Sequence, residues 1–297
     1  MTVSIEWFGC ATFRMRVGGR TLFFDSYLDG DRAPGSGTVG LRADDVDRAD
    51  FVFVSHAHFD HVLGADRIAA RTGAVVVGSY EVAHTLAAAG VPDVQLLRVS
   101  GGEPVDCGGG VRVRAFPALH SCLFAHGAKD SGVECLGDLD VPAQERDARA
   151  TELLSLVPVL GEPVAGWHHE RVHRSSVRDG GQLAYLVETS EGAVWVSSSA
   201  GYWSGIIRDL RPDVALIAAS GRPNVDGEPY QGSLAGFLLG EVELLRPDRV
   251  IFSHHDALLP PVLTETDTSE AEAVLHREAS YAPVAKLEYG DDLTLLG

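Results

Sequence analysis

The sequence predicts an α/β fold in which two β-sheets are flanked by helices within one domain. Short apolar stretches bounded by Gly, Asp and Pro alternate with segments whose apolar residues recur at helical spacing. The strand-like stretches fall into two runs, each interspersed with helices, which is typical of layers packed around one core. Because the 297 residues contain no repeat, low-complexity tract or clear linker, we expect a single domain over residues 1–297.

The first run of strands occupies residues 3–116. Gly18 and Gly19 predict a hairpin turn, because glycine adopts a positive φ without strain. Ser79 predicts the N-cap of a helix that ends before Gly90. We expect strands over 3–8, 11–17, 20–24, 50–54, 74–77, 94–99 and 110–116, helices over 62–71 and 79–89, and a loop over 27–44.

The second run begins at residue 182 and includes an amphipathic helix over 231–245. One face of this helix is expected in the core, because its apolar residues recur at helical spacing: Leu234, Phe237, Leu238, Val242 and Leu245. The other expected elements are strands over 182–188, 193–196, 213–218 and 249–252, a helix near 269–277, and two closing strands that end at 296.

Residues 121–180 separate the two runs and contain one clear helical segment, over 144–156. Because this stretch is too long for a simple connection, we interpret it as an insertion or lid over a site. Its basic group could bind a carboxylate or phosphate, and the alternative is a solvated surface with incidental charge. That group comprises His168, His169, Arg171, His173, Arg174 and Arg178, and His126 is a further lid candidate.

The composition is that of a globular protein with a strongly acidic surface. Hydrophobic residues make up 45% of the chain, charged residues 22%, and the formal net charge is −18. Because nucleic-acid backbones and anionic membranes repel an acidic body, we expect neither as the main partner. The four cysteines form no Cys-x-x-Cys pair, and no segment has the pattern of a signal peptide or membrane span. We therefore expect a cytoplasmic protein with reduced thiols.

Metal-ligating side chains gather directly after an expected strand. His56, His58, Asp60 and His61 lie within six residues, between an apolar run and a helix-like segment. Two further histidines, His120 and His254, also follow strands. Neutral imidazole and carboxylate are ligands that Zn²⁺, Fe and Mn accept, so this pattern predicts a metal site at one edge of the sheets. A merely His-rich polar loop would not explain the two distant strand-end histidines.

The motif His-x-His-x-Asp-His, followed by two later strand-end histidines, resembles the metallo-β-lactamase superfamily. The opening over residues 5–13, continued through Asp25, is similar to the branch of metal-dependent hydrolases that includes the ascorbate-phosphate lactonases. This resemblance implies a four-layer αββα sandwich of two mixed β-sheets flanked by helices.

The resemblance also assigns roles to individual residues. It implies that His56, His58 and His120 bind a first metal, whereas Asp60, His61 and His254 bind a second. Asp25 would orient a ligand histidine from behind. His255 stays open as an alternative to His254, because both directly follow the same expected strand.

Ser199 departs from the family pattern. The family places an aspartate that bridges both metals after a strand matching 193–196, and this position falls on Ser199 here. A serine is neutral and a poorer ligand than a carboxylate. Two ions bridged by water, one ion at the three-histidine site, or a redox metal are therefore all open.

The resemblance implies a metal-dependent hydrolase of a small molecule, of the lactone, ester or phosphoester type. One or two Zn²⁺ ions, or Fe or Mn, would supply hydroxide near neutral pH. Asp60 would orient this hydroxide and pass its proton to the leaving group. The alternatives are a lyase or iron-dependent oxygenase of the same fold, or a non-catalytic binding protein. A small-molecule partner is expected, and a homo-oligomer is left open.

Overall fold

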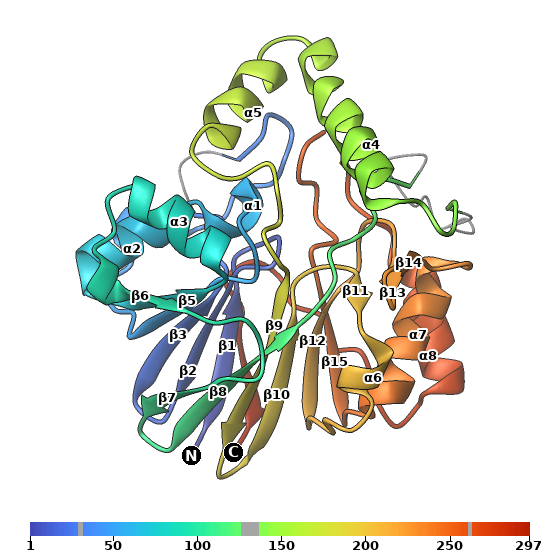
Figure 1. The fold of residues 1–297 in the computed structure, drawn as a ribbon. Helices are drawn as coiled ribbons and strands as arrows, with labels where there is room; N and C mark the ends of the chain where they lie inside the picture. The colour runs from blue at the N-terminus through green and yellow to red at the C-terminus, as the bar shows by residue number, and fades with distance from the viewer. Residues whose placement is uncertain (29–31, 126–136, 261–262) are drawn as a thin grey trace.

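The computed structural model describes residues 1–28, 32–125, 137–260 and 263–297, which form four layers in the order helices, sheet, sheet, helices (Figure 1). The predicted αββα sandwich is confirmed. Both termini lie at one end of the sandwich, and the segment that carries α4 and α5 covers the opposite end (Figure 1).

The first sheet has seven strands in the order β16-β1-β2-β3-β4-β5-β6. Neighbours from β16 to β3 are antiparallel and those from β3 to β6 are parallel, so the sheet is mixed. Its strands are β1 (Val3–Trp7), β2 (Phe13–Val17), β3 (Arg20–Phe24), β4 (Phe51–Phe53), β5 (Val75–Gly78), β6 (Leu96–Arg98) and β16 (Asp292–Leu296). Its outer face is covered by α2 (Ala65–Thr72) and α3 (Tyr80–Ala88), with η1 (Ala43–Asp45), α1 (Phe59–Val62) and η2 (Asp93–Gln95) in the connections.

The second sheet has six strands in the order β15-β12-β10-β9-β8-β7. They are β7 (Pro104–Gly108), β8 (Val111–Pro117), β9 (Leu183–Thr189), β10 (Gly192–Ser197), β12 (Val214–Ala218) and β15 (Arg249–Ser253). Three helices cover its outer face: α6 (Ser204–Ile207), α7 (Leu234–Leu245) and α8 (Ser269–Glu278). A small third sheet comprises β11 (Gly201–Tyr202), β13 (Asn224–Val225) and β14 (Glu228–Pro229).

The core between the two sheets is built by alternation along the strands. Val3 and Ile5 of β1 face Val187 of β9 and Leu216 of β12 in one cluster of fully buried side chains. Fully burying one such side chain stabilises the fold by about 1.5–3 kcal/mol. A second cluster lies between the first sheet and its helices, and a third lies between the second sheet and its helices. Apolar packing therefore holds each layer against the next.

The described residues between β8 and β9 form the cap over the ends of the sheets. They contain α4 (Ala143–Ser155), η3 (Val157–Leu160) and α5 (Val164–Val172). In Figure 1 these helices stand above the strand ends at which the candidate site lies. His126 and Cys135 fall outside the described residues.

Most predicted elements are present, with differences that have local causes. The helix expected over 62–71 is two helices, because Gly64 has φ +115° and interrupts the chain between α1 and α2. Ser79 caps α3 as predicted, accepting a hydrogen bond from Val82 N at 3.3 Å. One closing strand, β16, is found among the described residues where two were expected, and β7 and α5 were not predicted. Among the described helices, none is long and apolar enough to cross a membrane.

One buried carboxyl in this fold leads to a stability prediction. Glu241 of α7 is 2% exposed within the cluster under the second sheet, and Oε1 has no hydrogen-bond partner among the described residues. Burial raises the pKa of Glu241 from 4.5 to about 8, against a smaller opposing effect of Trp195. Between these values the folded state holds a proton that the unfolded state has lost, so stability falls as pH rises from 4.5 to about 8.

We therefore expect Glu241→Gln to be more stable than the parent at pH 9 by about 1–3 kcal/mol, because an amide is cheaper to bury than a carboxylate. At pH 5 the difference should be much smaller. Urea unfolding at both pH values measures it. Glu243→Gln, an exposed position on the same helix, is the matched control and should change stability equally little at either pH.

Candidate metal centre

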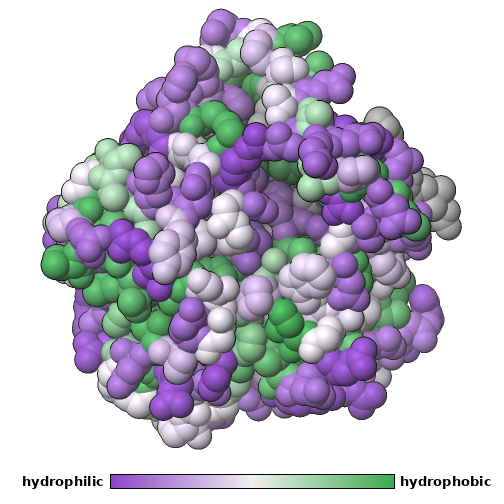
Figure 2. Space-filling model, in the orientation of Figure 1, coloured by the Kyte–Doolittle hydropathy of each residue, from purple (hydrophilic) through white to green (hydrophobic). Residues whose placement is uncertain are grey.

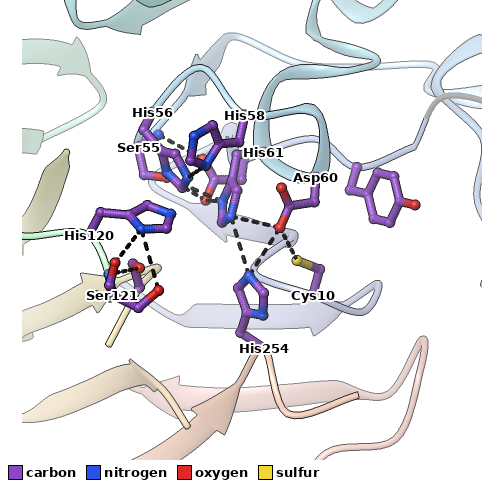
Figure 3. A network of polar contacts seen from close by, with 12 residues as sticks. Cys10, Ser55, His56, His58, Asp60, His61, His120, Ser121 and His254 are labelled. Atoms are coloured by element: carbon purple, nitrogen blue, oxygen red, sulfur yellow. Dashed lines mark hydrogen bonds and ion pairs between the residues drawn. The ribbon is translucent and has the colours of Figure 1, made fainter. Parts of the chain in front are cut away.

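The candidate ligands come from segments far apart in the sequence that end at the same edge of the two sheets. His56 follows β4, His58 precedes α1, His120 follows β8, and His254 directly follows β15. The structure groups side chains that could bind a metal ion into two adjacent donor sets, shown in Figure 3. This is the arrangement that the strand-end pattern predicted.

The first donor set contains His56, His58 and His120, one ring nitrogen of each lying within 4.8 Å of the others. His56 Nε2 and His58 Nδ1 are 3.1 Å apart. His120 Nδ1 donates to the carbonyl of Ser121 at 2.8 Å, which places the lone pair of this ring on Nε2. No fourth ligand joins these three imidazoles in the part of the chain that the structure describes, which leaves a position for water or substrate, as in catalytic zinc sites.

The second donor set contains Asp60, His61, His254 and Cys10, again within 4.8 Å of one another. Asp60 Oδ2 lies 3.1 Å from His61 Nε2 and 3.2 Å from His254 Nε2. The two imidazole nitrogens are 3.3 Å apart, and Cys10 Sγ lies 3.6 Å from the same carboxylate oxygen. All four residues therefore direct donor atoms at one small volume (Figure 3).

Asp25 supports both sets from behind. Its Oδ2 accepts from His61 Nδ1 at 2.9 Å and from Ser55 Oγ at 2.9 Å, and its Oδ1 accepts from Ser55 N at 2.7 Å. The Ser55 hydroxyl also lies 3.0 Å from His56 Nδ1. The bond to Asp25 keeps the lone pair of His61 on Nε2, which faces Asp60 and His254.

The two sets differ in charge. In the first set, burial lowers the pKa of His58 to about 3 with His120 adding to the effect, and burial also lowers the pKa of His56 and His120. These rings are therefore neutral, as metal ligation requires.

In the second set, carboxylates outweigh burial. Burial alone would lower the pKa of His61, but Asp60 and Asp25 raise it to about 10. Burial alone would raise the pKa of Asp60, but His61 and His254 hold it well below its usual range. This set thus pairs buried carboxylates with positive charge, which a divalent cation can supply in place of protons. The donor types of both sets fit a divalent metal ion.

The remaining predicted residues lie around this centre. Ser199 accepts a hydrogen bond from Ser121 N at 3.1 Å beside His120, and belongs to neither donor set. His255 stacks on Trp7 with ring centroids 5.1 Å apart. The geometry therefore places His254, rather than His255, with Asp60.

The basic residues of the cap lie on different faces of α5, some buried and some exposed. His169 and His173 are exposed and contact each other, with their Nε2 atoms 3.0 Å apart. Arg171 is buried, and its guanidinium lies 4.3 Å from the centroid of the Trp167 ring. His168 is the member of this group that lines the cavity above the metal centre.

That cavity has a volume of about 500 Å³ and lies beneath the cap, where Figure 2 shows the surface to be hollowed. His58, Asp60, His120 and His254 lie at its base. The rest of the lining is predominantly apolar and comes from the cap and from the segment after β15: Leu153, Leu156, Val157, Val159, Leu160, Val172, Leu258, Leu259 and Leu263. The arrangement can hold an apolar molecule against the three-histidine set.

Residues 20–137 match the family described as the β-lactamase superfamily domain. Over this segment, which carries the His-x-His-x-Asp-His motif, the chain is similar to that superfamily. The chain is also similar to the UPF0173 metal-dependent hydrolase MK1542 of Methanopyrus kandleri, at 27% identity over 97% of both chains. It is 33% identical to a UPF0173 metal-dependent hydrolase of Pyrobaculum arsenaticum over 119 residues, which cover 40% of this chain and 51% of the relative. The chain thus spans about half the length of the curated relatives it matches first.

Solved structures with a similar fold include Igni18, a metallo hydrolase from Ignicoccus hospitalis. It is 21% identical, with a TM-score of 0.61, over 99% of this chain and 98% of the other. CmlA, a diiron β-hydroxylase from Streptomyces venezuelae, is 18% identical, with a TM-score of 0.58, over 99% of this chain and 54% of the other. At these identities the likeness concerns the fold.

Sequence reasoning missed two residues of the centre. Cys10 has no Cys-x-x-Cys partner, and it lies three residues after the end of β1, whereas His254 directly follows β15. Ser55 directly precedes the His-rich motif, and its hydroxyl contacts Asp25 and two histidines. No local pattern in the sequence marks either residue, because their contacts with Asp60 and Asp25 are tertiary.

Proposed function

We propose that the protein is a metal-dependent hydrolase that cleaves a small ester or lactone with a largely apolar body. The observation that carries this proposal is the three-histidine set at the base of an apolar cavity of about 500 Å³. Relatives named metal-dependent hydrolases support the reaction class. We also propose that the resident ion is zinc and that the protein is cytoplasmic. The cap, which the sequence predicts over residues 121–180, would act as a lid over the site.

His56, His58 and His120 would hold the ion that serves the reaction, each through one neutral ring nitrogen. When bound, a divalent ion supplies a Lewis acid and makes the water it holds more acidic. The cap residues would exclude bulk water and bind the acyl or alkyl part of the substrate. A catalytic group at the base and an apolar wall above it are the features that ester cleavage requires.

The lining favours an ester or lactone over a phosphoester. Among the described lining residues, Arg222 is the only arginine or lysine, whereas leucines and valines predominate. A phosphoester would place at least one negative charge among these side chains with few donors to pair it. Arg222 is compatible with one carboxylate on an otherwise apolar substrate, so an anionic substrate of this kind is part of the proposal.

The test is a panel of neutral aryl and alkyl esters, γ-lactones and phosphodiesters, assayed with protein freed of metal and then restored with zinc. We expect zinc-dependent hydrolysis of esters or lactones, at rates well above those for phosphodiesters. A protein that binds zinc yet turns over none of the esters and lactones would contradict the proposal.

Asp60 is expected to act during turnover as well as in metal binding. Its ionised carboxylate lies at the cavity base, with Oδ2 3.1 Å from His61 Nε2 and 3.2 Å from His254 Nε2, so it can orient a nucleophile and accept a proton. We expect Asp60→Asn to lose about 10²–10⁴-fold in kcat and still fold, a range typical of general acid–base groups. Circular dichroism checks the fold, and unchanged kcat would exclude this role.

An oxygenase with iron is a second candidate, favoured by Ser199 in place of a bridging carboxylate and by the fold shared with the diiron hydroxylase CmlA. Metal analysis of the purified protein and O₂ uptake distinguish the two. Iron content together with substrate-dependent O₂ uptake would favour the oxygenase, and zinc content with ester cleavage the hydrolase.

A further inference from the structure

We propose that Cys10 is a thiolate ligand which completes the second donor set, so that four protein atoms enclose the second ion. This inference rests on the metal binding assumed in the proposed function, and it does not depend on which reaction follows. It divides the centre into an open three-histidine site and a closed site made by Cys10, Asp60, His61 and His254.

Four of the six distances between the donor atoms match those of one tetrahedron, and the other two, from Cys10 Sγ to the imidazoles, are within 4.8 Å. In a tetrahedral zinc site with nitrogen and oxygen ligands at about 2.0–2.1 Å, neighbouring ligand atoms lie about 3.3 Å apart, and a sulfur at about 2.3 Å lies about 3.5 Å from an oxygen. Asp60 Oδ2 lies 3.1 and 3.2 Å from the two imidazoles, which are 3.3 Å apart. Cys10 Sγ lies 3.6 Å from the same oxygen.

The backbone holds Cys10 and His254 together. Cys10 O accepts from His254 N at 2.9 Å and from Trp7 Nε1 at 2.9 Å. Cys10 N donates to the carboxylate of Asp256, with both oxygens at 2.9 Å. Cys10 and His254 both have left-handed backbones, with φ of +50° and +59°, an unfavourable conformation for these residues that clusters at functional sites.

A neighbouring carboxylate cannot take this place as readily. Asp256 is bound by Cys10 N, by Arg32 at 3.1 Å and by Tyr289 Oη at 2.7 Å, so its charge is already paired. Ser199 supplies no charge and belongs to neither donor set. A thiolate at Cys10 would therefore restore the negative ligand that the second ion loses at position 199, with a soft donor that favours zinc, iron or cobalt over magnesium.

The enclosed position of Cys10 indicates what the second ion does. The cavity is lined by His58 and His120 of the first set and by Asp60 and His254 of the second, whereas Cys10 does not line it and is fully buried. Sites with four protein ligands are structural, and sites with three keep a position for chemistry. The second ion would then fix His254 and Asp60 and add positive charge next to the first set, without binding water itself.

Cobalt(II) absorption tests this ligand directly, because a thiolate bound to cobalt gives an intense near-ultraviolet charge-transfer band that imidazole and carboxylate lack. Protein freed of metal is titrated with cobalt(II) up to two equivalents. We expect the band in the parent protein, its loss in Cys10→Ser, and an affinity for one of the two ions reduced on the order of 100-fold or more. Cys107→Ala, at a buried cysteine on β7, is the matched control and should keep the band.

A band that survives in Cys10→Ser, or its absence from parent protein holding two cobalt ions, would overturn the inference. Zinc-edge X-ray absorption of the parent protein gives the same answer without a mutation. We expect a zinc–sulfur distance of about 2.3 Å, and two bound zinc ions without sulfur would refute the ligand. A band without turnover of any ester would refute only the hydrolase, whereas ester cleavage without a band would refute only Cys10.

Discussion

His120→Ala should bind one metal ion fewer and lose about 10³-fold or more in kcat/KM towards the ester or lactone that the parent hydrolyses. The ring of His120 is the one member of the first donor set that comes from the second sheet, so His56 and His58 alone would remain. Two neighbouring imidazoles do not hold a catalytic ion well, and the loss of its charge stabilisation is worth several kcal/mol in the transition state.

The measurements are metal content after dialysis and steady-state kinetics at saturating zinc. His84→Ala is the matched control, because His84 is exposed on α3 and should leave both values unchanged. Folding should survive in His120→Ala, since the hydrogen bonds of the lost ring among the described residues are to Ser121 O and Ser121 Oγ, each worth about 1 kcal/mol. Two tightly bound ions and normal turnover in this variant would show that the reaction does not use the three-histidine set.

The His-x-His-x-Asp-His motif could be recognised from sequence because its geometry is local. The turn after β4 and the single turn of α1 place His56, His58, Asp60 and His61 within one short segment. Local backbone geometry thus brings together two of the three residues of the first donor set and two of the four residues of the second before any tertiary contact is known. His120 and His254 could be added because each follows an apolar strand, and strands of such sheets end at a common edge.

Cys10 could not be placed in this way, because its role depends on a tertiary contact. The backbone of His254 binds Cys10 across the two sheets, 244 residues along the chain (254 − 10), and no local pattern signals such a contact. The same contact separates His254 from His255, whose ring turns to Trp7 instead. The choice between these two histidines therefore needed the structure.

The periodicity of the α5 sequence distinguishes a buried face from an exposed one. In α5, Val164, His168 and Arg171 recur at helical spacing and are buried, whereas His169 and His173 are exposed. Treating this segment as an amphipathic helix would have separated a cavity-lining histidine from the surface pair. The adjacency of these charges in sequence predicts one basic group instead, and the two faces of the helix divide it.

Asp25→Asn should lower the free energy of unfolding of the metal-free protein by about 2–4 kcal/mol, the second of the two largest effects expected. Asp25 is 1% exposed and accepts from Ser55 N, Ser55 Oγ and His61 Nδ1. Asparagine tolerates the φ of +52° at this position, so the backbone is not strained by the change. The amide of asparagine would place an N–H donor opposite the Ser55 hydroxyl or the His61 imidazole, which are themselves donors. A buried donor, and the charge that Asp25 balances, would then have no partner.

Metal binding should report the same defect through a different route. Without the carboxylate behind it, His61 loses the bond that keeps its lone pair on Nε2, so affinity for the second ion should fall about 10–100-fold while the first set keeps its ion. Urea unfolding in chelator and zinc titration measure the two effects separately. Asp93→Asn, at an exposed aspartate in η2, is the control and should change neither. If Asp25→Asn lowered stability yet bound two ions with parental affinity, Asp25 would support the fold alone, and the orientation of His61 would have to come from Ser55.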